Sequence, residues 1–289
     1  MQAGKELPRA AQAPADLSSL RAELTRRLDQ AELELPLLPG VALEVTSAAA
    51  REDVDARVLA DLLKRDAAMA AHVLRVVNSP LYSARGQVVS LQQAVARVGA
   101  AKIREIALIV ACKASVFKVP GYEAEVSAVF EHSIAAALTG QEIARATRNN
   151  VEDAFLCGLL HDIGRPVLLQ TLVGLAREQR VSLEREGLLE LTSELHCRAG
   201  AALASAWKLP EAVIGAITHH HSAVPEHVAA VHITALGDAA AHAVLDGAED
   251  PAALLASHPS LSLLEIYPDV LQRILGKVAS VRETAKALS

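Results

Sequence analysis

Aromatic residues are rare in this sequence of 289 residues: Phe, Trp and Tyr together make up 2% of it, while hydrophobic residues as a whole make up 52%. The apolar residues are therefore mainly Ala, Leu and Val. Glycine and proline are also sparse outside the apparent segment boundaries. Because Ala and Leu favour helices, and Gly and Pro interrupt them, the composition predicts an all-α protein with an ample hydrophobic core.

Cysteines and long apolar runs are few as well. The chain has three cysteines, Cys112, Cys157 and Cys197, which are odd in number and far apart. This pattern indicates buried thiols in a reducing compartment, not a disulfide framework. No uninterrupted apolar run approaches about 18 residues, and no basic-then-apolar signal opens the chain. We therefore expect a cytoplasmic protein with no membrane contact.

An excess of positive charge is also missing. The 28 Lys and Arg residues and 34 Asp and Glu residues leave a formal net charge of 28 − 34 = −6. No basic stripe stands out along the chain. Because binding to nucleic acid depends largely on neutralising phosphates, we expect no nucleic-acid partner.

Helical periodicity and the positions of proline divide the chain into four segments. The proline-rich segment Leu35–Pro39 forces extended backbone, and we expect it to pin the chain to the core. Pro120 and Gly121 end the first half. We predict two packed helical subdomains, with these limits: a tail and first helix at 1–30, a first subdomain at 31–120, a second at 121–245, and closing helices at 246–289.

One stretch, Phe155–Leu169, reads FLCGLLHDIGRPVLL and places His161 beside Asp162 in an apolar setting. Gly164 and Pro166 are typical of a helix end, so we expect the pair in the last turn of a helix. A buried imidazole beside a buried carboxylate is costly unless each is paired or bound to a cation. A hydrogen-bonded core pair and a metal site both remain open for this pair taken alone.

Further His and Asp residues lie within or at the ends of apolar helices, and each alone has a structural explanation. Imidazole and carboxylate are the usual ligands of Zn, Mn, Fe, Co and Ni. Gathered from five helices, they predict a divalent-metal site within a helical bundle. The candidates are His132, His161, Asp162, His196, the run His219–His221, and Asp238. We assign surface or structural roles to His72, His227, His232, His242 and His258.

Several longer motifs resemble the HDOD family over about residues 31–245. They are LPLLP at 35–39, DAAMAAHVLRVVNSPLY from Asp66, SLQQAVARVGAAKIREIAL from Ser90, GLLHDIGR, Glu194-Leu-His196 with Gly200, and Trp207-Lys-Leu-Pro210. This resemblance implies a bacterial signal-transduction protein whose second half is an HD-domain-like helical bundle. It implies action through regulatory protein partners, with a link to cyclic-di-GMP, a nucleotide second messenger.

The resemblance also implies one or two metal ions. Asp162 would bridge them, and the His pair aligns best as His220–His221, with His219–His220 as the open alternative. The first ion would take His132, His161, Asp162 and Asp238. The second would take Asp162, His196 and one or both of His220 and His221.

The alternative function is a metal-dependent phosphohydrolase or phosphodiesterase of the HD superfamily, as in the HD-GYP enzymes. Three features depart from that pattern: Arg165 replaces the Lys after HDIG, no Gly-Tyr-Pro follows the His run, and Ala128 stands where a third-metal Glu would be. Arg and Lys are not interchangeable at a phosphate. We therefore expect a regulatory role first, without turnover of cyclic-di-GMP, and in an enzyme we expect Arg165 to contact phosphate.

Overall fold

The computed structural model describes residues 13–14, 17–49, 51, 53–79, 86–115, 118–179, 181–182, 184–222, 228–278 and 281–288. The predicted all-α class is confirmed in these ranges. The helices are α1 (Leu17–Asp29), α2 (Gly40–Ala49), α3 (Ala56–Lys64), α4 (Ala67–Val77), α5 (Leu91–Ser115), α6 (Glu123–Thr147), α7 (Val151–Leu160), α8 (Gly164–Gln179), α9 (Arg185–Ala206), α10 (Glu211–His219), α11 (Ala229–Leu245), α12 (Pro251–Leu255), α13 (Pro259–Leu263), α14 (Pro268–Val278) and α15 (Val281–Leu288). A two-residue strand, β1 (Ala13–Pro14), pairs in parallel with another, β2 (Val181–Ser182).

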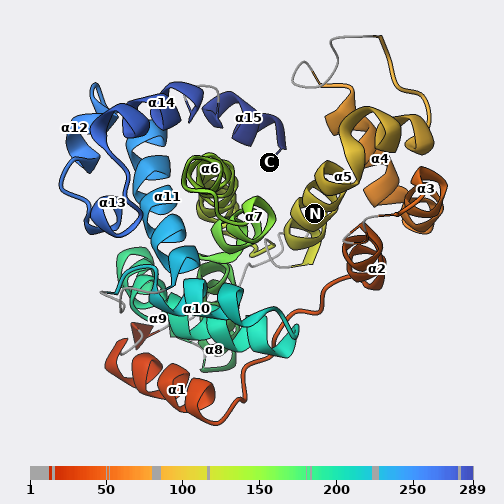
Figure 1. Cartoon of the computed structure of the whole chain (residues 1–289). Helices are drawn as coiled ribbons and strands as arrows, with labels where there is room; N and C mark the ends of the chain where they lie inside the picture. The colour runs from red at the N-terminus through yellow and green to blue at the C-terminus, as the bar shows by residue number, and fades with distance from the viewer. Residues whose placement is uncertain are drawn as a thin grey trace, which may run out of the picture.

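The helices form two groups (Figure 1). Helices α2 to α5 make one group, and α6 to α15 make the other, with α1 packed against α9. The predicted boundary near residue 120 lies in the short connection between α5 and α6. None of the described helices is both long and apolar enough to cross a bilayer.

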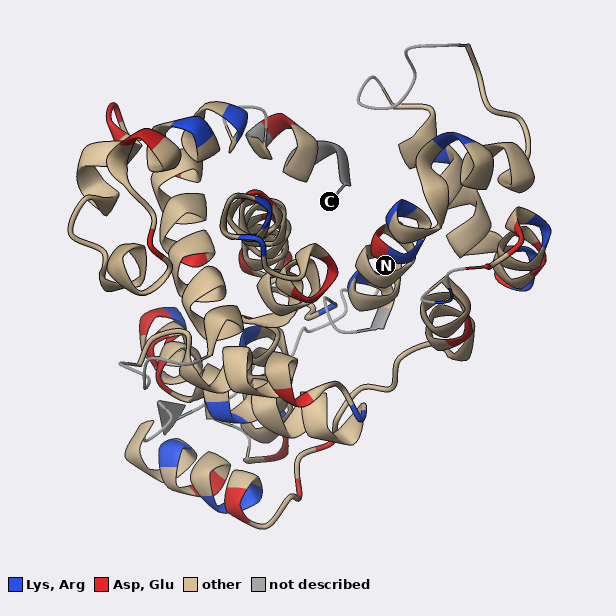
Figure 2. Ribbon diagram, viewed as in Figure 1, with Lys and Arg blue, Asp and Glu red and all other residues tan. Residues whose placement is uncertain are grey.

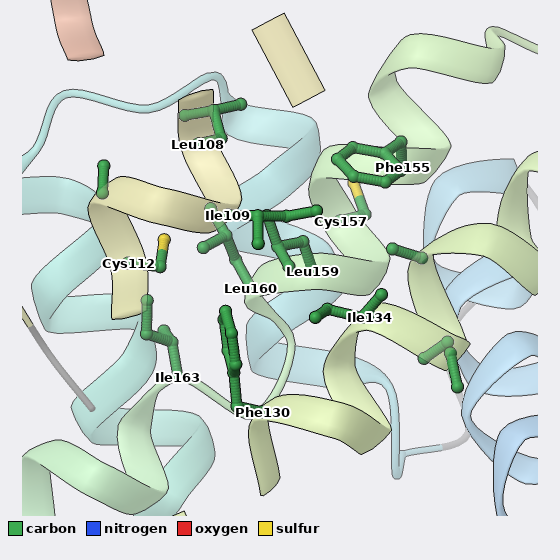
Figure 3. Close-up of a cluster of buried hydrophobic side chains, with 14 of the residues drawn as sticks. Leu108, Ile109, Cys112, Phe130, Ile134, Phe155, Cys157, Leu159, Leu160 and Ile163 are labelled. Carbon is green, nitrogen blue, oxygen red and sulfur yellow. The ribbon is translucent and has the colours of Figure 1, made fainter. Parts of the chain in front are cut away.

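Helix α5 joins the two groups. Gly99 has a non-helical φ of 83° and divides α5 into two parts. Beyond this kink, Leu108, Ile109 and Cys112 lie in the same apolar cluster as side chains of the second group (Figure 3). These partners include Phe130, Phe155, Leu159, Leu160 and Ile163. The first group is therefore fixed to the second through a shared core.

A buried polar contact also crosses from α5 to α6. Glu105 is 6% exposed and accepts a hydrogen bond of 2.7 Å from the side-chain amide of Gln141. Lys102 pairs with the same carboxylate. Because a buried carboxylate is costly without partners, this pairing fixes the relative positions of the two helices.

Charged residues of both signs are frequent on α1 and α3 (Figure 2). In contrast, Asp238 is the one acidic residue of the apolar helix α11, and α11 has no Lys or Arg. Asp238 is buried at 7% exposure. A buried carboxylate in the middle of an apolar helix needs a partner, which the site described below supplies.

The proline-rich segment Leu35–Pro39 docks on the end of α9. The indole Nε1 of Trp207 donates a 2.7 Å hydrogen bond to the carbonyl of Pro36. Leu38 is buried, whereas Leu37 is 85% exposed. The expected pinning of this segment thus runs through Leu38 and the indole of Trp207.

Replacing Trp207 with Phe should lower the free energy of unfolding by about 1 to 2 kcal/mol, because it removes the hydrogen bond and leaves the Pro36 carbonyl less well paired. Urea denaturation would measure the change. Leu37→Ala, in the same segment, is the matched control and should change stability by less than about 0.5 kcal/mol. Equal losses in the two variants would show that the indole does not hold the segment.

Candidate metal centre

His161 and Asp162 lie in the turn between α7 and α8, which corrects the sequence-based expectation. Helix α7 ends at Leu160, residues 161–163 form a turn, and α8 begins at Gly164. Pro166 therefore stands in the first turn of a helix, where a missing N–H costs nothing. Gly164 is needed for another reason: a Cβ there would lie 2.0 Å from the carbonyl oxygen of His196.

Three histidines of the site are oriented in the same way. Nδ1 of His161 lies 2.7 Å from the carbonyl of Gly158, and Nδ1 of His196 lies 2.6 Å from that of Ser193. Nδ1 of His220 lies 3.0 Å from the carbonyl of Ile217. A carbonyl oxygen only accepts, so each Nδ1 donates its proton to backbone three residues earlier. Whenever such a ring is neutral, its Nε2 lone pair is therefore left for another partner, as in metal-bound histidines.

These Nε2 atoms converge on the carboxylate of Asp162. Nε2 of His196 lies 3.2 Å from Oδ1 of Asp162 and 3.3 Å from Nε2 of His220. Nε2 of His220 lies 3.9 Å from the same Oδ1. Two ligand atoms about 2.1 Å from one ion lie about 3 to 3.5 Å apart. Two of the three distances in this trio lie in that range, and the third, 3.9 Å, is somewhat longer.

A second group forms around Asp238. Its Oδ1 lies 2.9 Å from Nε2 of His132 and 3.6 Å from Nε2 of His161. The His161 Nε2 is also 3.7 Å from Oδ2 of Asp162. Asp162 thus stands between the two groups, with one oxygen toward each.

Burial and charge set the protonation of these groups. Burial lowers the pKa of His196 to about 4 and that of His220 to about 3, so both rings are neutral near pH 7. Burial also opposes the charged form of His161, but the carboxylates of Asp162 and Asp238 outweigh it and raise its pKa to about 9. Although burial disfavours their charge, neighbouring imidazoles hold the pKa of both carboxyl groups well below its ordinary range.

The arrangement is unfavourable without a cation. The Nε2 atoms of His196 and His220 face the Oδ1 of Asp162, and none of the three carries a proton to share. Oδ1 of Asp162 and Nε2 of His161 are buried without a hydrogen-bond partner among the described residues. Facing acceptors repel one another, and an unsatisfied buried group costs about 1 to 3 kcal/mol. The His/Asp cluster is therefore compatible with metal binding. It contains more groups than the hydrogen-bonded pair of His161 and Asp162 that the sequence alone left open.

The sequence left two possible ligand pairs in the histidine run at the end of α10, His219–His220 and His220–His221. His220 is buried and faces Asp162, whereas His219 is exposed. His221 is half-exposed, and its Nδ1 lies 3.9 Å from Oδ2 of Asp238. The structure brings His220 and His221 to the cluster. With His132, His161, Asp162, His196 and Asp238, they complete the predicted ligand set in one place.

His242 is a site residue that the sequence reasoning missed and assigned to a surface or structural role. Its Nε2 lies 3.5 Å from Oδ1 of Asp238, and its ring stacks on His132 with centroids 4.2 Å apart. The signal that could have identified it was its position four residues after Asp238, on the same face of a helix.

Of the other histidines given surface or structural roles, His232 is buried, whereas His227 lies outside the described residues.

A cavity of about 480 Å³ opens onto the cluster. Its inner wall includes His132 and Asp162, and Arg165 lies beside them. The guanidinium Nε of Arg165 donates a 2.8 Å hydrogen bond to Oδ2 of Asp162. A small molecule in this cavity would meet both the ligand cluster and a cationic side chain.

Comparison with known proteins places these observations in context. An uncharacterized protein of Treponema pallidum is 26% identical over 226 residues, which cover 75% of this chain and 42% of that protein. A structure of an HDOD domain protein of unknown function from Geobacter sulfurreducens matches with a TM-score of 0.69 and 26% identity, covering 94% of this chain and 97% of that one. A provisionally named metal-dependent phosphohydrolase from Shewanella amazonensis matches with a TM-score of 0.71 and 22% identity, covering 93% and 99%.

The HDOD domain model matches residues 35–223, about two thirds of the chain. This range includes the proline-rich segment, helices α2 to α10 and every predicted ligand except Asp238, which the fold brings in from α11. The order and packing of the helices agree with those of the solved HDOD domain protein. The chain is therefore a member of the HDOD domain family.

Proposed function

We propose that this protein is a metal-dependent phosphohydrolase built on an HDOD fold. The observation that supports the proposal is the close contact of three unprotonated acceptors, Nε2 of His196, Nε2 of His220 and Oδ1 of Asp162. A divalent cation bound to all three would remove the repulsion between them.

The ligand set divides into two groups that share Asp162. The first ion would be held by His132, His161, Asp162 and Asp238, and the second by Asp162, His196, His220 and His221. Mixed imidazole and carboxylate ligands suit Zn, Mn, Fe, Co or Ni. Bound ions of this kind supply water of lowered pKa and neutralise charge on a phosphoryl group.

The side chains of the cavity would bind and orient the substrate. Arg165 is the cation on the cavity wall, and its guanidinium, whose Nε donates to Asp162, can donate its other N–H groups to a phosphate. Val129 and Leu245 form part of the same wall and limit water around the ester. The provisional name of the Shewanella amazonensis protein, which shares the fold, agrees with this proposal.

Hydrolysis of p-nitrophenyl phosphate tests the proposal. Purified protein loaded with Mn²⁺, and in parallel with Zn²⁺ or Fe²⁺, should release p-nitrophenol, and dialysis against a chelator should reduce the rate at least about 100-fold. Restoring the ion should recover the rate. A protein that binds metal in full but shows no hydrolysis with any of these ions would contradict the proposed activity.

A second candidate function is that of a regulatory protein that binds protein partners within cyclic-di-GMP signalling. Exposed apolar residues of the first half are available to contact a partner, among them Leu37, Leu43 and Val58 with exposures of 85%, 45% and 49%. Calorimetric titration with cyclic-di-GMP tests the link to the nucleotide. Micromolar binding without hydrolysis would favour the regulatory role, whereas hydrolysis that disappears in Asp162→Ala would exclude a purely regulatory one.

A further inference from the structure

The outer rim of the cavity carries negative charge, although its inner end is suited to a phosphate. Glu131 of α6 and Asp246 at the end of α11 line the rim. Neither carboxylate has a hydrogen bond or ion pair with any described side chain. Asp162, 5% exposed and with its Oδ1 unpartnered, lies at the inner end. The cavity therefore has two ends with different chemistry.

A second cavity borders this rim. It has a volume of about 580 Å³ and shares His242 and Asp246 with the first cavity. Its far wall includes Ser257 and His258, next to α13. These residues lie beyond the range 35–223 that the family model matches. The second cavity therefore lies between α11 and these closing helices.

Unpaired carboxylates at a rim select ligands in two ways. A carboxylate only accepts hydrogen bonds, so it binds hydroxyl and amino groups. It also repels a nearby anion. Repulsion between two like unit charges about 4 Å apart in water weakens the binding of the anion about fivefold. The apolar residues Val129 and Leu245 beside the carboxylates add a surface for the uncharged part of a ligand.

We propose that the site takes a phosphate monoester whose remaining part is uncharged or cationic and carries hydroxyl or amino groups, such as a nucleoside or sugar monophosphate. Glu131 and Asp246 select this class by accepting hydrogen bonds from it and by repelling a second phosphate. The inference rests on the proposed hydrolase. In the reaction, water adds to phosphorus, the ester P–O bond breaks, and one proton of the water passes to the leaving oxygen, which gives an alcohol and inorganic phosphate.

Binding of two non-hydrolysable probes tests the selection. They are the phosphonate analogue of adenosine 5′-monophosphate and the same analogue with a 3′-phosphate, titrated calorimetrically into Mn²⁺-loaded protein. The first probe should bind at least about fivefold more tightly than the second. In the double variant Glu131→Gln/Asp246→Asn the difference should fall below about twofold. Glu249→Gln, at an exposed carboxylate outside both cavities, is the control and should keep it.

Equal binding of the two probes, or a difference that persists in the double variant, would overturn the selection. The two proposals fail separately. If the probes differ as expected but p-nitrophenyl phosphate is not hydrolysed, the selection by the carboxylates is upheld and the hydrolase is wrong. If p-nitrophenyl phosphate is hydrolysed and the probes bind equally, the hydrolase stands and this selection is wrong.

Discussion

Replacing Asp162 with Ala should abolish hydrolysis of p-nitrophenyl phosphate, with a loss in kcat/KM of at least about 1,000-fold, or about 4 kcal/mol of transition-state stabilisation. Asp162 is the carboxylate that faces both ligand groups, with Oδ1 toward His196 and His220 and Oδ2 toward His161. Its removal therefore weakens both ion sites at once. Steady-state kinetics with the same metal concentration in each assay would measure the loss.

Two further variants make this result interpretable. Asp162→Asn keeps the shape of the side chain and removes its charge, so it should lose activity while keeping the fold, as circular dichroism would show. Asp153→Asn, on the preceding helix α7 and away from the cluster, should keep wild-type kcat/KM. Hydrolysis that survives in Asp162→Ala would place the reaction elsewhere in the molecule.

Gly164→Ala should lower the free energy of unfolding by more than about 3 kcal/mol. The added Cβ would lie 2.0 Å from the carbonyl oxygen of His196 and 2.6 Å from the backbone nitrogen of Gly200. Both are backbone atoms, so α9 as a whole must move away from α8. Because α9 carries His196, the same variant should also bind less metal. Urea denaturation and metal titration would measure the two effects.

The matched control lies in the same helix. Gly174 of α8 has no atom within 4 Å of an added Cβ, and its backbone is helical. Gly174→Ala should therefore stabilise the protein by about 0.5 to 1 kcal/mol through helix propensity alone. Similar losses in both variants would mean that the close approach of α8 and α9 does not limit the choice of residue at position 164.

Much of the fold was predictable because local signals and the core agree. Helices Ala67–Val77 and Glu211–His219, for example, are each bounded by strong local signals in the sequence. Asp66 accepts hydrogen bonds from the backbone of Ala68 and Met69 at the first helix, and Pro210 precedes the second. The candidate ligands could be found because His and Asp residues are unusual inside apolar helices.

What the sequence could not predict depends on contacts between distant segments. Gly164 resembles a helix end, but its role is set by the backbone of α9, more than 30 residues later. The choice of His220 and His221 over His219 depends on how the end of α10 faces Asp162. Glu131 lines the cavity only because α6 packs along α11. Such packing between distant segments cannot be inferred from residue pattern and spacing alone.

The most direct test of the metal centre is the metal content of purified, tag-free protein, measured by elemental analysis after loading under reducing conditions. The account predicts two equivalents of divalent metal in the wild type and none in the double variant His161→Ala/Asp162→Ala. Fewer than one equivalent in the wild type, or equal content in the two proteins, would contradict it and leave these His and Asp residues as polar groups of the core.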